Sequence, residues 1–107
     1  MEESNVRMVL VGILTDPHKP KALEALYKPH YLREVICLET DAGGVAAKVF
    51  KRGQSRYKRR PHSTLPPPPV NCKEIKQALT ATLPDGFTIT AVEDKGDHVL
   101  IIMEERK

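Results

Sequence analysis

The chain of 107 residues has no tryptophan, two phenylalanines and three tyrosines, so aromatic side chains make up only 5% of it. A sheet that stacks RNA bases on exposed aromatic residues, as in RRM domains, is therefore not expected. No apolar run approaches the ~20 residues that a membrane helix needs. The sequence also lacks a Gly-rich phosphate-binding motif, a nucleophile elbow and the ligand spacing of a zinc site.

Cysteine is scarce, because only Cys37 and Cys72 are present. One possible pair is no disulfide framework, and its wide spacing is not that of a metal site. We interpret both as reduced thiols, with a single disulfide as the alternative. The first residues lack the positive charge with which a signal peptide starts. We therefore expect a cytoplasmic protein, or a nuclear one in a eukaryote, that does not bind membranes.

Acidic residues are absent between Ala42 and Lys73. This stretch contains eight cations, and since the whole chain has a net charge of +3, the remainder carries −5. A basic block on an otherwise acidic chain is a local feature rather than a general habit of composition. The cations are Lys48, Lys51, Arg52, Arg56, Lys58, Arg59, Arg60 and Lys73.

The length predicts one α+β domain over residues 1–107, with a single hydrophobic core. The nearly continuous aliphatic run from Val6 to Leu14 favours a strand that is buried on both faces. A short helix is expected from Pro20 to Lys28, before Pro29. A second helix is expected from Asn71, because Asn71 and Glu74 have the spacing of a capping box.

Further strands are predicted at 33–40, 45–50, 87–93 and 98–104, with tight turns at 41–44 and 94–97. The resulting order is β-α-β-β-α-β-β. Without its last strand this is the split β-α-β order of ferredoxin-like domains, with two helices on one face of an antiparallel sheet.

The last strand is apolar at successive positions from Val99 to Met103. At a sheet edge such a strand invites pairing with another chain, which predicts a homodimer or a protein partner. The alternative is that Val6–Leu14 and Val99–Met103 are both central strands of a complete monomer.

Residues 51–70 have few large apolar side chains, so we expect a mobile basic and proline-rich loop within the domain. Its cations suit a phosphate backbone, and Tyr57 suits a stacked base. A solvated loop, a contact with an acidic protein and a nuclear-localisation patch at 58–60 are the alternatives. The candidate nucleic-acid-binding residues are Lys48, Lys51, Arg52, Arg56, Tyr57, Lys58, Arg59 and Arg60.

A proline tract follows the cations. It favours polyproline II and could dock into an aromatic groove of a protein partner, and the alternative is a stiff spacer. The candidate partner-binding residues are Leu65, Pro66, Pro67, Pro68 and Pro69.

The four histidines are scattered, so we expect no catalytic site, no cofactor and no metal. The sequence predicts a small non-enzymatic nucleic-acid-binding accessory protein, with RNA or single-stranded DNA slightly preferred. The alternative is a protein-interaction module, an inhibitor or adaptor that uses the basic loop or the proline tract.

Overall fold

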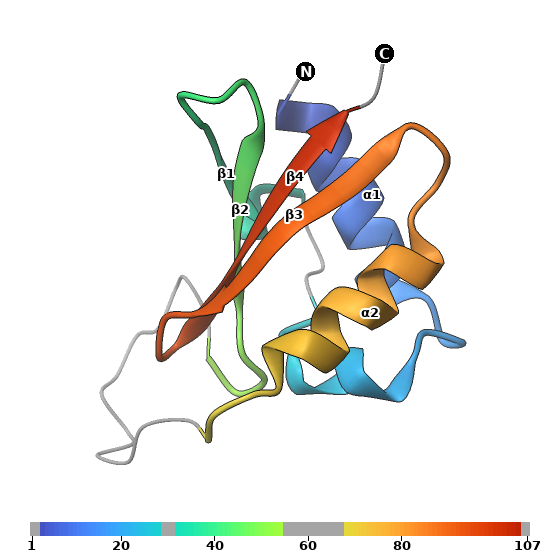
Figure 1. Ribbon diagram of the computed structural model, residues 1–107. Helices are drawn as coiled ribbons and strands as arrows, with labels where there is room; N and C mark the ends of the chain where they lie inside the picture. The colour runs from blue at the N-terminus through green and yellow to red at the C-terminus, as the bar shows by residue number, and fades with distance from the viewer. Residues whose placement is uncertain (1–2, 29–31, 55–67, 106–107) are drawn as a thin grey trace.

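The computed structural model describes residues 3–28, 32–54 and 68–105, and Figure 1 labels their helices and strands. The expectation of a mobile loop at 51–70 falls mostly on 55–67, outside the described residues. In chain order the elements are α1 (Glu3–Thr15), the 3₁₀-helices η1 (Lys21–Ala25) and η2 (Leu32–Glu34), β1 (Ile36–Glu39), β2 (Val45–Phe50), α2 (Cys72–Thr82), β3 (Phe87–Asp94) and β4 (His98–Glu105).

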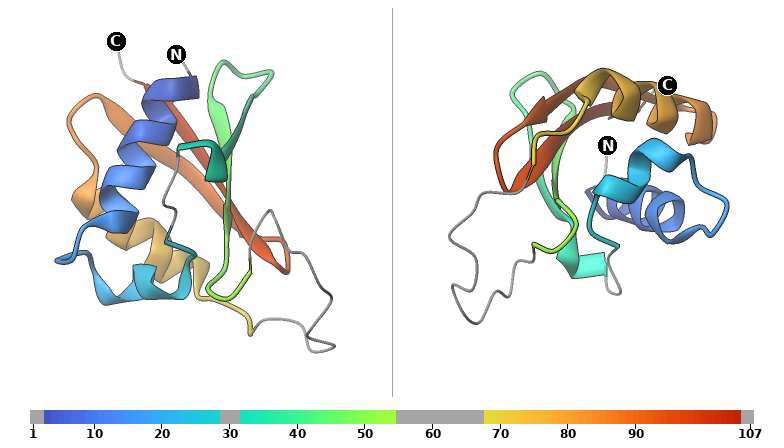
Figure 2. Two further views of the ribbon diagram at one scale, coloured as in Figure 1. Left: turned by 180° about the vertical axis from the view of Figure 1, so that it is seen from behind. Right: turned by 90° about the horizontal axis from the view of Figure 1, so that it is seen from below.

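The four strands form one sheet in the order β1-β2-β4-β3, in which all neighbours are antiparallel. Figure 2 shows α1 beside the β1–β2 hairpin, and α2 packs against β3. The buried residues of both α-helices belong to the same core as the inward side chains of β2 and β4, which alternate with half-buried ones. An α+β domain with an antiparallel sheet and two α-helices in the described residues is therefore confirmed.

The predicted strand at Val6–Leu14 is wrong, because these residues lie in α1. A short apolar run does not by itself distinguish a buried strand from a buried helix. The burial is helical: Val6, Leu10 and Leu14 recur every four residues in the core, whereas Met8 is 59% exposed. The observed order is therefore α-β-β-α-β-β, and the predicted β-α-β-β-α-β-β order fails at its first element.

The next two elements are shorter than predicted. Only the 3₁₀-helix η1 forms between Pro20 and Lys28, and the strand expected from Arg33 is β1, which starts at Ile36. The turn η2 occupies the expected first residues of that strand. The prediction for α2 is confirmed, because the Asn71 side chain accepts a hydrogen bond from the Glu74 backbone N–H at 3.1 Å.

The C-terminal strand is central, so its predicted place at the sheet edge is wrong. β4 is hydrogen-bonded to β2 on one side and to β3 on the other. Val99, Ile101 and Met103 are fully buried in the core, and Leu100 and Ile102 lie half-buried on the other face. The alternative account is therefore right that Val99–Met103 is a central strand, although Val6–Leu14 is not a strand. No helix among the described residues is long and apolar enough to cross a membrane.

Two glycines test this architecture in opposite directions. Gly12 lies inside α1 with open space where a Cβ would be, so Gly12→Ala is expected to raise the free energy of unfolding by about 0.5–1 kcal/mol. A Cβ on Gly44 would lie 2.7 Å from the Met103 carbonyl oxygen, so Gly44→Ala is expected to lower it by about 1–3 kcal/mol. Urea unfolding measures both, and destabilisation by Gly12→Ala would contradict the helix.

Candidate nucleic-acid interface

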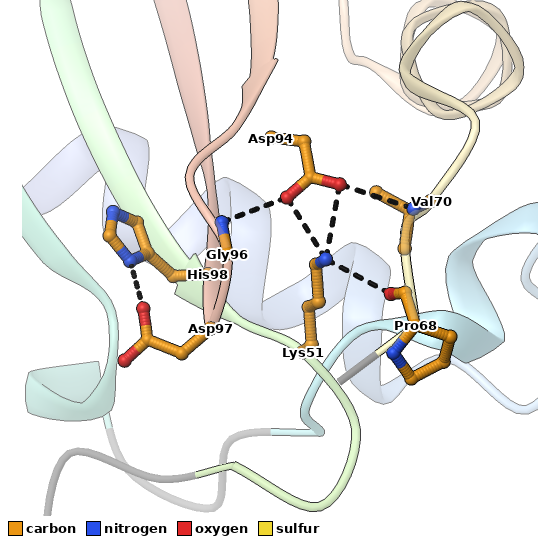
Figure 3. A network of polar contacts seen from close by, with 7 residues as sticks. All are labelled: Lys51, Pro68, Val70, Asp94, Gly96, Asp97 and His98. Atoms are coloured by element: carbon orange, nitrogen blue, oxygen red, sulfur yellow. Dashed lines mark hydrogen bonds and ion pairs between the residues drawn. The ribbon is translucent and has the colours of Figure 1, made fainter. Parts of the chain in front are cut away.

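The side chain of Lys51 links three segments at the end of the sheet where β2 stops (Figure 3). Its ammonium lies 2.9 Å and 3.0 Å from the two carboxylate oxygens of Asp94, at the end of β3. It also donates a hydrogen bond to the Pro68 carbonyl at 3.0 Å. Asp94 in turn accepts from the Val70 backbone N–H at 3.2 Å. We call this group of four residues the Lys51–Asp94 clasp.

The clasp is sheltered from water on the lysine side. The side chain of Lys51 is 4% exposed and that of Asp94 is 24% exposed. The Gly96 N–H, the Lys51 ammonium and the Val70 N–H hold the pKa of Asp94 at about 2, below its ordinary value of 3.8. Asp94 therefore stays ionised at neutral pH and compensates the buried cation.

The clasp brings together residues that are far apart in the sequence. Lys51 and residues 68–70 flank residues 52–67, so both ends of that segment are fixed at one end of the sheet. Lys51 itself is buried, and the folded sheet therefore extends into the first residue of the predicted loop.

A hollow rich in cations lies beside the clasp. Leu26 pairs with Lys51 in an isolated antiparallel bridge, and the Arg52 N–H donates to the Ala25 carbonyl at 2.7 Å. The Tyr27 N–H donates to the Phe50 carbonyl at 2.6 Å. These bonds place the residues after η1 against those after β2. The hollow has a volume of about 530 Å³, and its lining is Lys19, Glu24, Leu26, Tyr27, Lys28, Arg52 and Gly53.

We call this cavity the basic hollow, because three of its lining side chains are cationic and one is acidic. Tyr27 supplies a half-buried aromatic ring beside these charges. Such a surface can hold a phosphate against the cations and a base against the ring.

A second group lies on the sheet next to the clasp. The Lys48 ammonium is 5.3 Å from the centroid of the Phe50 ring, whose edge packs against His98 at a centroid distance of 6.1 Å. His98 Nδ1 lies 2.6 Å from Asp97 Oδ1, and this hydrogen bond lowers the pKa of Asp97. Phe50 is buried, so it offers no free ring face for a base.

The described part of the predicted nucleic-acid site divides into three environments. Arg52 is exposed and lines the basic hollow, Lys48 is half-buried above Phe50, and Lys51 is buried in the clasp. We leave Lys51 out of the proposed interface, because its ammonium already has partners. The remaining predicted residues, which are Arg56, Tyr57, Lys58, Arg59 and Arg60, lie outside the described residues.

The predicted partner-binding tract is also described only at its end. Pro68 and Pro69 are exposed, and the Pro68 carbonyl accepts the bond from Lys51. This anchoring favours the interpretation of the tract as a spacer. Leu65, Pro66 and Pro67 lie outside the described residues.

Sequence reasoning missed Lys19, Tyr27 and Lys28 because it searched for cations only in the acid-free stretch. The pair Tyr27-Lys28, an aromatic residue next to a cation before a proline, is the signal that was available.

The described residues contain no cluster of three or more side chains that could hold a metal ion. Comparisons with protein-family models, curated proteins and solved structures found no match.

The clasp predicts an acid-sensitive contribution to stability. Because Asp94 has a lower pKa in the folded chain than in the unfolded one, its stabilisation is present above pH 3.8 and is lost as the pH falls towards 2. We expect Asp94→Asn to lower the free energy of unfolding at pH 7 by about 3 kcal/mol, since Lys51 stays buried without its counter-charge.

The matched control is Asp85→Asn, which removes one exposed carboxylate outside the clasp and should cost less than about 1 kcal/mol. In a Lys51→Met background, Asp94→Asn should cost much less than in the wild type. Urea unfolding at pH 7 and pH 3 measures all five chains: the wild type, the control, the two single variants of the clasp and the double variant. Equal costs of Asp94→Asn in both backgrounds would contradict the clasp.

Proposed function

We propose that this chain is a small non-enzymatic accessory protein that binds the phosphate backbone of RNA or single-stranded DNA. The proposed interface consists of the basic hollow and the cations of residues 52–60. The observation that carries the proposal is the position of residues 52–67 within the acid-free stretch: both ends of this segment are held at the clasp, beside a hollow that other cations line. Each phosphate that such cations neutralise releases counterions, which favours binding.

The chemistry of the interface favours single strands. Arginine offers a planar fork that fits a phosphate bidentately, and Arg52 presents one at the hollow. Unpaired bases can stack on Tyr27, whereas paired bases in a duplex are not accessible to it. Contacts between cations and phosphates carry no sequence information, so we expect weak sequence preference.

The fold supports a finer proposal about its topology. The helix α2 connects β2 to β3, and β4 lies between these two strands, which makes a split β-α-β unit. α1 and β1 precede this unit, where a ferredoxin-like domain has its last helix and strand after it. We propose that the fold is a circular permutation of the ferredoxin-like topology, in which the last helix and strand come first in the chain.

The first test removes cations from the basic stretch. Replacing Lys58, Arg59 and Arg60 by alanine together should weaken binding to single-stranded RNA and flatten the slope of log affinity against log salt by about 2, at about 0.7 per contact. The matched control removes the same charge at Lys21, Lys73 and Lys76, which are exposed and lie outside the basic hollow.

Fluorescence anisotropy at several salt concentrations measures these slopes for RNA, single-stranded DNA and duplex DNA. Equal slopes in both triple variants would show that binding depends only on net charge and would contradict this interface. Absence of binding at low salt would overturn the proposal and favour an acidic protein partner.

The second test concerns the aromatic ring in the hollow. Tyr27→Ala should weaken single-strand binding by about 1–3 kcal/mol, the contribution of one stacked base, whereas Tyr27→Phe should bind nearly as well as the wild type. Thermal melting establishes that both variants are folded. Equal binding by the two variants would remove Tyr27 from the interface.

A further inference from the structure

The sheet has a second face, on which its half-buried residues gather. Both α-helices of the described chain share the core on the opposite face. The pairing of the strands places two rows across β2, β4 and β3 on this open face. One row is Ala46, Ile102 and Ala91, and the other is Lys48, Leu100 and Glu93.

These rows have a symmetry about the central strand. Ile102 is flanked by an alanine on each side, so the profile of that row is the same from β2 and from β3. Leu100 is flanked by opposite charges, Lys48 on β2 and Glu93 on β3. Across β2, β4 and β3 this surface has similar side chains and opposite charges on its two sides, so that part is complementary to itself after a half-turn, and β1 extends the sheet beyond β2 only.

We infer that a second copy of this chain packs on the open face, with a two-fold axis between the sheets that runs along β4. Such an axis places β2 of one copy over β3 of the other. Lys48 then lies opposite Glu93 of the partner subunit, and the reverse pair forms on the other side. Ile102 and Leu100 pack on their own symmetry mates, as an isologous interface requires.

The charges select this axis over its alternative. A two-fold axis across the strands that passes over the row of Leu100 would place Lys48 on Lys48 and Glu93 on Glu93, and one midway between the two rows would place each charge over an alanine. Like charges at such a contact are unfavourable, and complementary ones fix the register of an interface. Packed sheets lie about 10 Å apart, which the long side chains of lysine and glutamate can span from both sides.

The contacts that these charges make within one chain leave them available. Glu93 pairs with Lys95 at 3.4 Å, and both side chains are more than 40% exposed, so this pair contributes little. The Lys48 ammonium rests 5.3 Å from the Phe50 ring centroid and has no ion pair among the contacts of the described chain. After the hydrogen bond with His98, the charge of Lys48 also helps to lower the pKa of Asp97. Leu38, on the edge strand β1, is 64% exposed and enlarges the apolar surface.

A charge-reversal cycle tests the inference independently of nucleic-acid binding. Sedimentation equilibrium of the wild type should give a dimer at micromolar concentrations. Lys48→Glu and Glu93→Lys should each raise the dimer dissociation constant by about tenfold or more, and the double variant should return it to within about threefold of the wild type. Lys76→Glu and Glu24→Lys, at exposed positions outside the sheet, are the matched controls and should leave it unchanged.

A wild-type monomer across this range would overturn the inference, as would single variants that dimerise normally. A double variant as weak as the single ones would also overturn it, because the proposed axis requires the swapped pair to re-form. A second measurement needs no substitution. In a mixture of isotope-labelled and unlabelled wild-type chains, the methyl groups of Ile102 and Leu100 should give NOEs between chains, and their absence would contradict the proposed packing.

Discussion

The burial of one cation organises the end of this sheet. An ammonium group with a 4% exposed side chain is costly unless it is paired and hydrogen-bonded, and Lys51 meets that demand with Asp94 and the Pro68 carbonyl. Its partners come from the end of β3 and from the segment before α2, so these segments have to meet where β2 ends. The meeting of Lys51 with residues 68–70 at this end of the sheet follows from this single requirement.

The two proposals divide the exposed surface of the sheet between two partners. The end of the sheet carries the clasp and the basic hollow, and there the chain is rich in cations. The open face carries alanine, leucine and isoleucine with one charge of each sign in the row of Leu100. A phosphate backbone fits the first surface and a second copy of the chain fits the other, so a dimer would carry two basic hollows. Lys48 belongs to the open face and does not line the hollow.

Local signals in the sequence predicted the local structure well. Asn71 caps α2, and the turns at 41–44 and 94–97 connect antiparallel strands, because capping and turn chemistry depend on neighbouring residues. The aliphatic run of α1 was misread because it satisfies the patterns of a buried strand and of a buried helix. Lys51 was predicted to contact phosphate, because its partner Asp94 lies 43 residues away in the sequence. Only the pairing of the strands brings the two side chains together.

The central claim is that nucleic acid binds at the basic hollow and the cations of residues 52–60, beside the clasp. Amide chemical-shift mapping during titration with a short single-stranded RNA tests it most directly. The account predicts that the largest shifts among the described residues occur at Tyr27, Lys28, Arg52 and Gly53, with small ones along α2. Shifts concentrated on α2 or on the open face around Leu100, or no shifts at low salt, would contradict it.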